Sequence, residues 1–455
     1  MRVTIIGGGI SGLTAAYDLH RGGAEVTLID AAGRLGGKLY SSPVGDRLVD
    51  AGPDTFLARV PDGFDLCKDL GIEGELTSPV APVPAYLWRD GERRPIPANS
   101  VLGVPTDLDA LAESGAVSPE GVARAAEDLE LPTTTIGDDI SVGAYMRARL
   151  GDEVTDRLID PILGGINASD IDRLSLRSGA PQLWDLATNN RSIIEALRKT
   201  AEERGATLGS AKDQPVFYGL PGGIARLAEK LLDALAKPNS AGTAATIRTG
   251  EAVTSLDAVI ADTAADRVII AVPAGPASAL LADAAPVASE RLGEIDYASV
   301  AQVTVELPKS GVDPILDASG VLFPRVDGRV MTASTWFSTK WAHYDRPDTV
   351  LIRMTSGRYG DARALALDDE GLTSLLLNEL KQVVSIEEDP VAVRVHRWVD
   401  SLPQYVPGHA ARVDEIFESV AADAPKVRLI GAAYHGIGIP ACVRGARQVA
   451  ADLLN

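Results

Sequence analysis

The chain has 455 residues, of which 45% are hydrophobic and 23% charged, and its formal net charge is −20. It is too long for one ordinary hydrophobic core, so the composition predicts a soluble globular protein of two or three interleaved domains. The excess of Asp and Glu argues against nucleic acid or an anionic membrane surface as a partner, because phosphate groups are bound by basic patches.

The cysteine content and the length of the apolar stretches indicate where in the cell the protein is expected. The two cysteines, Cys67 and Cys442, form no CxxC pair or Cys/His cluster, so we expect neither a disulfide framework nor a metal site. The chain opens in a strand pattern without a secretion leader, and its longest uncharged apolar stretch, 268–282, is too short for a membrane span. These features predict a cytoplasmic protein without a transmembrane segment.

The first thirty residues predict one βαβ unit. Residues 3–6 and 26–29 are β-branched, strand-like runs, and residues 13–21 between them have the apolar spacing of a helix. A GxGxxG pattern lies between the first strand and the helix, and Asp30 ends the second strand. This is the context in which a glycine-rich turn binds a dinucleotide.

Each residue type in this turn has a physical task. The first glycine permits a tight turn, the second lets the backbone approach a pyrophosphate, and the third lets helix and strand pack closely. The helix N-terminus offers free N–H groups to the pyrophosphate, and the acidic residue accepts hydrogen bonds from a ribose. The predicted cofactor contacts of this segment are Gly7, Gly9, Ile10, Ser11, Gly12 and Asp30.

A second glycine pair follows in "AGRLGGKL", residues 32–39, and it favours FAD over NAD. The element resembles the Arg-x-Gly-Gly segment that bends the chain back beside the cofactor in FAD enzymes of the amine-oxidase and glutathione-reductase type. On that resemblance Arg34, Gly37 and Lys38 are further candidate cofactor contacts, with Arg34 facing the pyrophosphate or adenine side; a solvated Arg34 is the alternative.

Along the rest of the chain the sequence pattern changes several times. Prolines interrupt the region after residue 80, helix-like segments run from about 106 to 210, and alternating segments between about 295 and 357 predict an antiparallel sheet. The predicted fold is α/β with α+β insertions. A discontinuous Rossmann-like FAD-binding domain is expected from residues 1–80, 211–290 and 391–455. A mixed-sheet substrate-binding domain is expected from residues 81–105 and 291–390. A helical inserted region is expected from residues 106–210.

Four later motifs point to one family: "LVDAGPDTFLAR" (48–59), "FYGLPGGIARLAEKL" (217–231), "HRWVDSLPQYVPGH" (396–409) and "AAYHGIGIPACVRGA" (432–446). Together with the opening fingerprint they resemble the protoporphyrinogen and coproporphyrinogen oxidases of haem synthesis over nearly the whole chain. The last two motifs are the most specific, because generic flavin amine oxidases differ there.

The resemblance implies non-covalent FAD with its adenine held by the leading glycines and its ring by the trailing ones. The Gly52–Pro53 turn and the glycines at 436 and 438 leave space for a flat ring, and the helix after Gly438 can stabilise negative charge on the reduced flavin. The candidate contacts carried over are Gly52, Pro53, Asp54, Thr55, Val253, Trp398, Ile437, Gly438 and Ile439. A core-filling Trp398 is an open alternative, and His435 is given no role.

The implied reaction removes six electrons from a porphyrinogen in three flavin cycles, with O2 as acceptor and H2O2 as product. No catalytic side chain is assigned, because the flavin carries the chemistry. The substrate carboxylates need cations, for which the candidates are Arg59, Arg89, Arg93, Arg94 and Arg353, each with a solvated surface charge as the alternative. Some family members have an Arg after the Gly-Pro turn; this chain has Asp54, so that contact is not carried over.

Coproporphyrinogen III is the favoured substrate, because soluble bacterial members of the family resemble the coproporphyrinogen type. Three alternatives stay open: a protoporphyrinogen IX oxidase, a flavin amine oxidase with flavin tethered through a cysteine such as Cys442, and a non-catalytic porphyrin carrier. The next enzyme of the haem pathway, a ferrochelatase-like protein, is a candidate partner.

Overall fold

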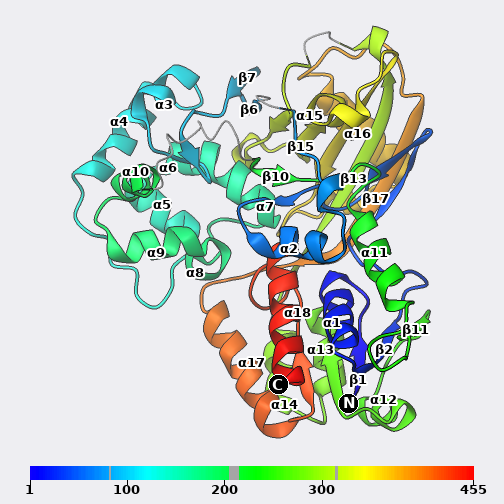
Figure 1. The fold of residues 1–455 in the computed structure, drawn as a ribbon. Coiled ribbons are helices and arrows are strands. Elements are labelled where there is room, and N and C mark those ends of the chain that lie inside the picture. Colours follow the sequence, from blue (N-terminus) through cyan, green and yellow to red (C-terminus); the bar gives the residue numbers. More distant parts are fainter. Residues whose placement is uncertain (81–83, 204–214, 313–315) are drawn as a thin grey trace.

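The computed structural model describes residues 1–80, 84–203, 215–312 and 316–455. Figure 1 shows a parallel sheet with its helices near both chain termini, a larger mixed sheet, and a group of helices beside them. This arrangement confirms the predicted α/β class with α+β insertions.

The smaller sheet has five parallel strands in the order β11-β2-β1-β12-β18. Their bounds are Arg2–Ile6 (β1), Glu25–Asp30 (β2), Thr246–Thr249 (β11), Arg267–Ile270 (β12) and Val427–Leu429 (β18). Helix α1 (Ile10–Arg21) connects β1 to β2, which confirms the predicted βαβ unit. The inner strands are almost continuously apolar, as a parallel sheet covered on both faces requires.

Helices cover both faces of this sheet. One face packs against α1, α2 (Pro61–Asp69), α11 (Ala225–Leu235) and α18 (Ile439–Leu454) through a core that contains Ile5, Leu28 and Ile269. The other face packs against α12 (Leu256–Thr263), α13 (Ala274–Leu281), α14 (Pro286–Gly293) and α17 (His409–Asp423). The first and last helices, α1 and α18, lie side by side (Figure 1), so the two ends of the chain meet.

The larger sheet has seven strands in the order β17-β13-β16-β15-β14-β6-β7. All neighbours are antiparallel except the parallel pair β14 and β6. The bounds are Ala85–Arg89 (β6), Glu92–Pro95 (β7), Tyr297–Pro308 (β13), Gly320–Leu322 (β14), Met331–Trp336 (β15), Thr349–Ser356 (β16) and Ala392–Pro403 (β17). The antiparallel pairing expected between residues 295 and 357 is therefore confirmed.

Alternation along the strands gives this sheet two different faces. Residues such as Val303, Val305 and Ile352 pack under α16 (Asp369–Leu380) in an apolar core. The intervening residues, among them Thr304 and Arg353, lie on the opposite face because side chains alternate along a strand. That face is polar, and it carries the contacts to the first sheet's region described below.

The domain boundaries stay a prediction. The strands of the five-stranded sheet come from three separated stretches of sequence, as a discontinuous domain requires. However, the predicted division groups residues 391–455 with this sheet, whereas β17 pairs with β13 in the seven-stranded sheet. The boundaries at residues 81 and 211 lie outside the described residues.

A hairpin of β3 (Ser41–Val44) and β4 (Arg47–Asp50) joins the regions of the two sheets. Arg47 forms a buried ion pair with Glu306 of β13 at 2.7 Å. Arg394 of β17 donates hydrogen bonds to the carbonyl oxygens of Ser42, Val49 and Asp50 at 2.6–2.9 Å. These contacts hold the hairpin against the polar face of the larger sheet.

The helical region comprises α3 (Leu108–Ser114), α4 (Pro119–Ala126), α5 (Val142–Leu150), α6 (Asp152–Val154), η3 (Thr155–Gly164), α7 (Gly165–Asn167), α8 (Leu176–Gly179), α9 (Pro181–Asn189) and α10 (Ile193–Glu203). Ser141 caps α5 by accepting a hydrogen bond from the Ala144 N–H, as its sequence predicts. The η3 segment is π-helical and contains Pro161. The segment "RSIIEALRKTAEERG" (191–205) predicts a helix at this place, and its residues 204–205 lie outside the described residues.

Short elements complete the chain: β5 (Phe56–Leu57) with β10 (Phe217–Tyr218), β8 (Ser100–Val101) with β9 (Val104–Pro105), and α15 (Phe337–Lys340). Among the described helices, none combines the length and the apolar character needed to cross a membrane.

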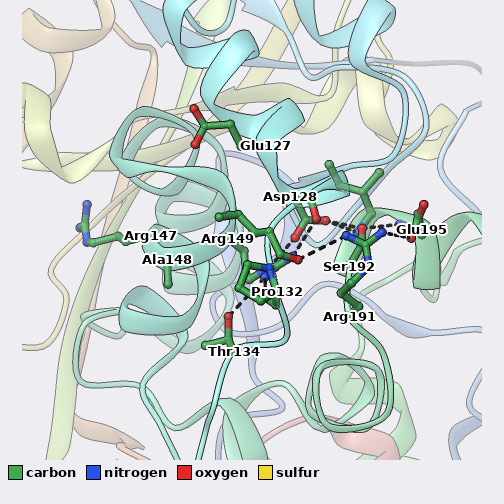
Figure 2. Close-up of polar contacts among 12 residues, drawn as sticks. Glu127, Asp128, Pro132, Thr134, Arg147, Ala148, Arg149, Arg191, Ser192 and Glu195 are labelled. Atoms are coloured by element: carbon green, nitrogen blue, oxygen red, sulfur yellow. Dashed lines mark hydrogen bonds and ion pairs between the residues drawn. The ribbon is translucent and has the colours of Figure 1, made fainter.

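A buried ion pair organises the helical region (Figure 2). The Arg149 Nε donates to Asp128 Oδ1 at 2.5 Å, and neither residue is more than 1% exposed. Further Arg149 nitrogens donate to the carbonyl oxygens of Asp128 and Pro132, while Asp128 Oδ2 accepts from the Ser192 hydroxyl and the Ile194 N–H. The network therefore ties the end of α5 to the start of α10.

We expect Arg149→Met to lower the free energy of unfolding by about 3–5 kcal/mol, because it leaves the Asp128 carboxylate buried without a cation. Urea unfolding followed by circular dichroism measures this change. The matched control is Arg191→Met in the same region, where a half-exposed pair with Glu195 is expected to contribute less than about 1 kcal/mol. Equal losses in the two variants would contradict a special role for the buried pair.

Candidate functional site

The glycine turn after β1 has the geometry that its sequence predicts. Gly7 has φ +108°, and a Cβ on Gly12 would lie 1.9 Å from the Gly7 carbonyl oxygen, so both positions need glycine. A Cβ on Gly9 would meet nothing within 4 Å. The space over Gly9, at the N-terminus of α1, is thus open to a ligand and suits a pyrophosphate.

Asp30 ends β2 beside this turn. Its two carboxylate oxygens accept hydrogen bonds from the Gly8 N–H at 2.6 Å and the Ala32 N–H at 2.7 Å. Each oxygen keeps a lone pair with which it can accept a ribose hydroxyl. In the next strand Thr249 is the register partner of Asp30, and half-buried Val253 follows four residues later, on the adenine side of the predicted site.

The Arg-x-Gly-Gly element folds back onto the same turn. The Gly36 N–H donates to the Gly8 carbonyl oxygen at 2.8 Å, and a Cβ on Gly37 would lie 3.1 Å from the Gly9 Cα. Arg34 donates to the Gly37 carbonyl oxygen and covers the Tyr40 ring, so its guanidinium is already engaged locally while remaining exposed.

The turn at Gly52–Asp54 is held from both sides. A Cβ on Gly52 would lie 2.2 Å from the Lys38 carbonyl oxygen. From the larger sheet, the Trp398 Nε1 donates to the Ala51 carbonyl oxygen at 2.5 Å and the Arg353 Nη1 to that of Gly52 at 3.1 Å. The structure therefore brings Lys38, Gly52, Arg353 and Trp398 together, as a site at this turn requires.

Asp54 is the centre of a buried ion cluster. Its carboxylate accepts from the Lys340 Nζ at 2.6 Å, the Arg353 Nη2 at 3.0 Å and the Trp341 Nε1 at 3.3 Å. Burial opposes ionisation, but the two cations outweigh it and hold the pKa of Asp54 well below its usual range. Two cations against one carboxylate leave excess positive charge next to the Gly52 backbone.

A second buried carboxyl lies nearby. Asp50 accepts from the Ser41 hydroxyl at 2.6 Å and the Ile224 N–H at 2.9 Å. Burial raises the pKa of Asp50 to about 7, with Asp54 adding to the shift against the hydrogen bonds. At neutral pH Asp50 therefore compensates only part of the positive charge around it.

The glycine turn before α18 meets the first one. Gly436 has φ +132° and its N–H donates to the Tyr405 hydroxyl at 2.9 Å, while Gly438 is exposed and precedes the first residue of α18. The buried Cys442 thiol lies against the Ser11 hydroxyl and Lys38, and burial raises its pKa. Ile437 is half-buried and Ile439 buried, and Pro440 is in the first turn of α18.

The predicted carboxylate-binding arginines lie in different surroundings. Arg59 is exposed, Arg89 pairs with Glu153 at 3.0 Å, and Arg94 pairs with Glu92. Arg93 lies over the Tyr86 and Trp336 rings. Among the candidates only Arg353 joins the cluster at the Gly52 turn. His435 is exposed and stacks on Phe417, which fits its lack of an assigned role.

Sequence reasoning missed three side chains of this site: Lys340, Trp341 and Arg394. The stretch that contains Lys340 and Trp341 has no motif, and only tertiary contacts bring it to Asp54. Arg394 could have been found, because it alternates with His396 and Trp398 along β17 and so shares a face with them.

Comparison with known proteins assigns the family. The profile of the flavin-containing amine oxidoreductases matches residues 10–454. The chain belongs to this family. It is 33% identical to the coproporphyrinogen III oxidase of Bacillus subtilis, over 100% of this chain and 98% of the relative. The corresponding enzyme of Staphylococcus aureus is 30% identical over 99% and 98%. A solved structure from Exiguobacterium sp. 255-15, described as a protoporphyrinogen oxidase, superposes with a TM-score of 0.85 at 29% identity, over 100% of this chain and 98% of that one.

Family membership confirms the expected flavin oxidoreductase with FAD as its cofactor and the resemblance to porphyrinogen oxidases. The residue-level contacts to the cofactor stay a prediction. The open space at Gly9, the spare lone pairs of Asp30 and the exposed backbone at Gly438 are each free to contact a ligand, as these predictions require.

The two glycines of the first turn allow a sharp test. We expect Gly9→Ala to fold normally but to bind FAD roughly tenfold or more weakly, because its methyl group enters only the ligand space. Gly12→Ala is the matched variant, and we expect it to destabilise the apoprotein itself by about 1–3 kcal/mol or more through its clash with the Gly7 carbonyl. Thermal unfolding of the apoproteins and fluorescence titration with FAD separate the two effects. Normal FAD affinity in Gly9→Ala would refute the assignment.

The raised pKa of Asp50 gives a pH dependence. Between its ordinary value of 3.8 and about 7, folded Asp50 holds a proton that the unfolded chain has released, so its contribution to stability falls as the pH rises through this interval. We expect the urea midpoint of Asp50→Asn to rise relative to that of the wild type from about pH 4 to about pH 7, with little further change above. A constant difference between the two proteins would contradict the assigned pKa.

Proposed function

We propose that this protein is an FAD-dependent oxidase of coproporphyrinogen III. It removes six electrons from the macrocycle in three two-electron steps and forms coproporphyrin III. Full-length similarity at 30–33% to enzymes that carry this name supports the proposal most directly. The buried excess of positive charge at the Gly52 turn supports it independently, because the substrate carries four carboxylates.

The side chains of this protein bind and orient rather than exchange protons. FAD, when bound, supplies the hydride acceptor. The turn at Gly9 and the N-terminus of α1 would bind its pyrophosphate, and Asp30 would bind its ribose. The backbone at Gly52 and Gly438 would hold its ring. Lys340, Arg353 and Asp54 fix the Gly52 turn and supply a positive potential for anionic groups.

The electron acceptor, the location and the pathway partner belong to the same proposal. O2 would be the terminal electron acceptor, and with two electrons and two protons per cycle it would give H2O2. The protein works in the cytoplasm, next to a ferrochelatase-like enzyme that uses its product. Nucleic acid is not a partner, in keeping with the net charge of −20.

The alternatives are less favoured. A covalent flavin link through Cys442 is disfavoured because that thiol is buried and its raised pKa keeps it protonated. A non-catalytic porphyrin carrier does not account for full-length similarity to oxidases. Protoporphyrinogen IX remains the competing substrate, and direct comparison separates it.

Anaerobic stopped-flow mixing of the FAD-loaded enzyme with each porphyrinogen tests the proposal. We expect coproporphyrinogen III to bleach the oxidised flavin band at a rate at least tenfold above that of protoporphyrinogen IX at equal concentration, because two of its four carboxylates have no counterpart in the other substrate. A primary amine such as putrescine is the negative control. No bleaching by either porphyrinogen would refute the function, and faster bleaching by protoporphyrinogen IX would reassign the substrate.

A further inference from the structure

Arg358 is a buried cation whose hydrogen-bond donors are not all paired by the described residues around it. It follows β16 directly and is 8% exposed. Its guanidinium lies 3.8 Å from Asp160 of η3, beyond hydrogen-bond distance, and its Nε has no hydrogen-bond partner in the described part of the chain. Arg325, Asp361 and Arg363 also act on it electrostatically. A buried guanidinium without hydrogen bonds is unfavourable unless a ligand or water completes it.

A small cavity adjoins this guanidinium. The volume of this cavity is about 30 Å³. One wall comes from η3 and the residues that follow it: Asp160, Pro161, Gly164, Gly165 and Ala168. The other wall comes from the strands of the larger sheet and the residues next to them: Val300, Phe323, Thr332, Thr355, Gly357 and Arg358. One water-sized group needs roughly 10–15 Å³, so the cavity has room for the two oxygens of one carboxylate. Its walls are otherwise mainly apolar or glycine.

The charges around the cavity leave it positive. Asp160 also accepts from the Arg325 backbone N–H at 3.1 Å, and the Arg325 guanidinium lies 3.9 Å from it. The Arg325 Nη2 donates to the carbonyl oxygens of Ser169 and Tyr359, although its Nε, like that of Arg358, is buried without a hydrogen-bond partner among the described residues. Asp361, the other carboxylate on the loop, is paired with Arg363. Three arginines, at positions 325, 358 and 363, thus share the two carboxylates of Asp160 and Asp361. Within the described residues, Arg358 is the one of the three whose guanidinium makes no hydrogen bond.

The cavity lies on the same face of the sheet as the candidate flavin turn. Thr355, in its wall, is two residues after Arg353 on β16, so it is about 7 Å further along the same face. Val300, also in its wall, is the register partner of Trp398, which bonds to the Ala51 carbonyl next to Gly52. A macrocycle whose reacting carbon is at the Gly52 turn would extend its arms across this face.

We propose that Arg358 binds one carboxylate arm of the porphyrinogen in this cavity and so contributes to selection of carboxylate-rich substrates. Guanidinium and carboxylate form two parallel charge-assisted hydrogen bonds, which the free Nε and the cavity's size accommodate. The inference rests on the proposed function, which supplies the anionic arms.

The test measures coupling between Arg358 and the charge of the ligand. Coproporphyrin III and its uncharged tetramethyl ester are titrated into FAD-loaded protein, and binding is followed by the porphyrin absorbance band and the flavin spectrum. In the wild type we expect the acid to bind more tightly than the ester. In Arg358→Met that preference should shrink roughly 10- to 100-fold, because one charge-assisted pair is lost. The FAD content of each variant reports its folding.

Two further variants separate ligand binding from a structural role. Arg363→Met removes an exposed arginine of the same loop and should keep the wild-type preference. The double variant Asp160→Asn/Arg358→Met removes both buried charges, so it folds without an unpaired carboxylate and should keep the reduced preference. An unchanged preference in Arg358→Met, or a restored one in the double variant, overturns the inference alone. If FAD-loaded wild type fails to bind coproporphyrin III at all, the proposed function fails with it.

Discussion

The ion cluster of Asp54, Lys340 and Arg353 sets the position of the turn on which the candidate site is built. Charges removed from water are unfavourable unless opposite charges and hydrogen bonds replace the lost hydration. Here the carboxylate has cations at 2.6 and 3.0 Å, and Arg353 also reaches the Gly52 carbonyl. The Gly52 backbone is thus fixed to β16 on one side, while the Lys38 carbonyl limits it on the other. A turn held this way keeps a constant distance from both sheets.

The neighbouring hairpin extends the same principle. Arg47 and Glu306 form a buried pair at 2.7 Å, and Arg394 satisfies three backbone carbonyls of the hairpin. Burial, together with Arg353 nearby, lowers the pKa of Arg394 to about 10, so it stays charged at neutral pH although its partners are mainly neutral oxygens. The junction of the two sheets therefore combines these polar contacts with an apolar cluster in which Val44 and Val49 of the hairpin pack against Leu351 of β16. The junction carries net positive charge within a protein of net charge −20.

Contacts between residues close in sequence could be predicted, whereas contacts between residues far apart in sequence could not. The βαβ unit, the glycine turns at Gly7 and Gly436 and the cap at Ser141 follow from local spacing, and the structure has them. The ion cluster could not be predicted, since Asp54 and Lys340 are 286 residues apart and neither lies in a pattern that names the other. Arg353 was singled out by its place on a strand, whereas its partner Asp54 was expected to contact the cofactor and was noted as a departure from the family pattern, not as the partner of a cation. Strand alternation would have added Arg394, because one face of β17 presents it together with Trp398.

An arginine can bind an anionic ligand when neighbouring carboxylates do not already neutralise its charge. Arg89 and Arg94 were candidates from the sequence, yet each is paired with a glutamate, so the surrounding potential is nearly neutral. Arg353 shares one carboxylate with Lys340, and Arg358 shares one with Arg325. Buried positive charge that exceeds its protein partners acts through a low dielectric and attracts anions strongly. An acidic protein can in this way bind a tetracarboxylate without a basic patch on its surface.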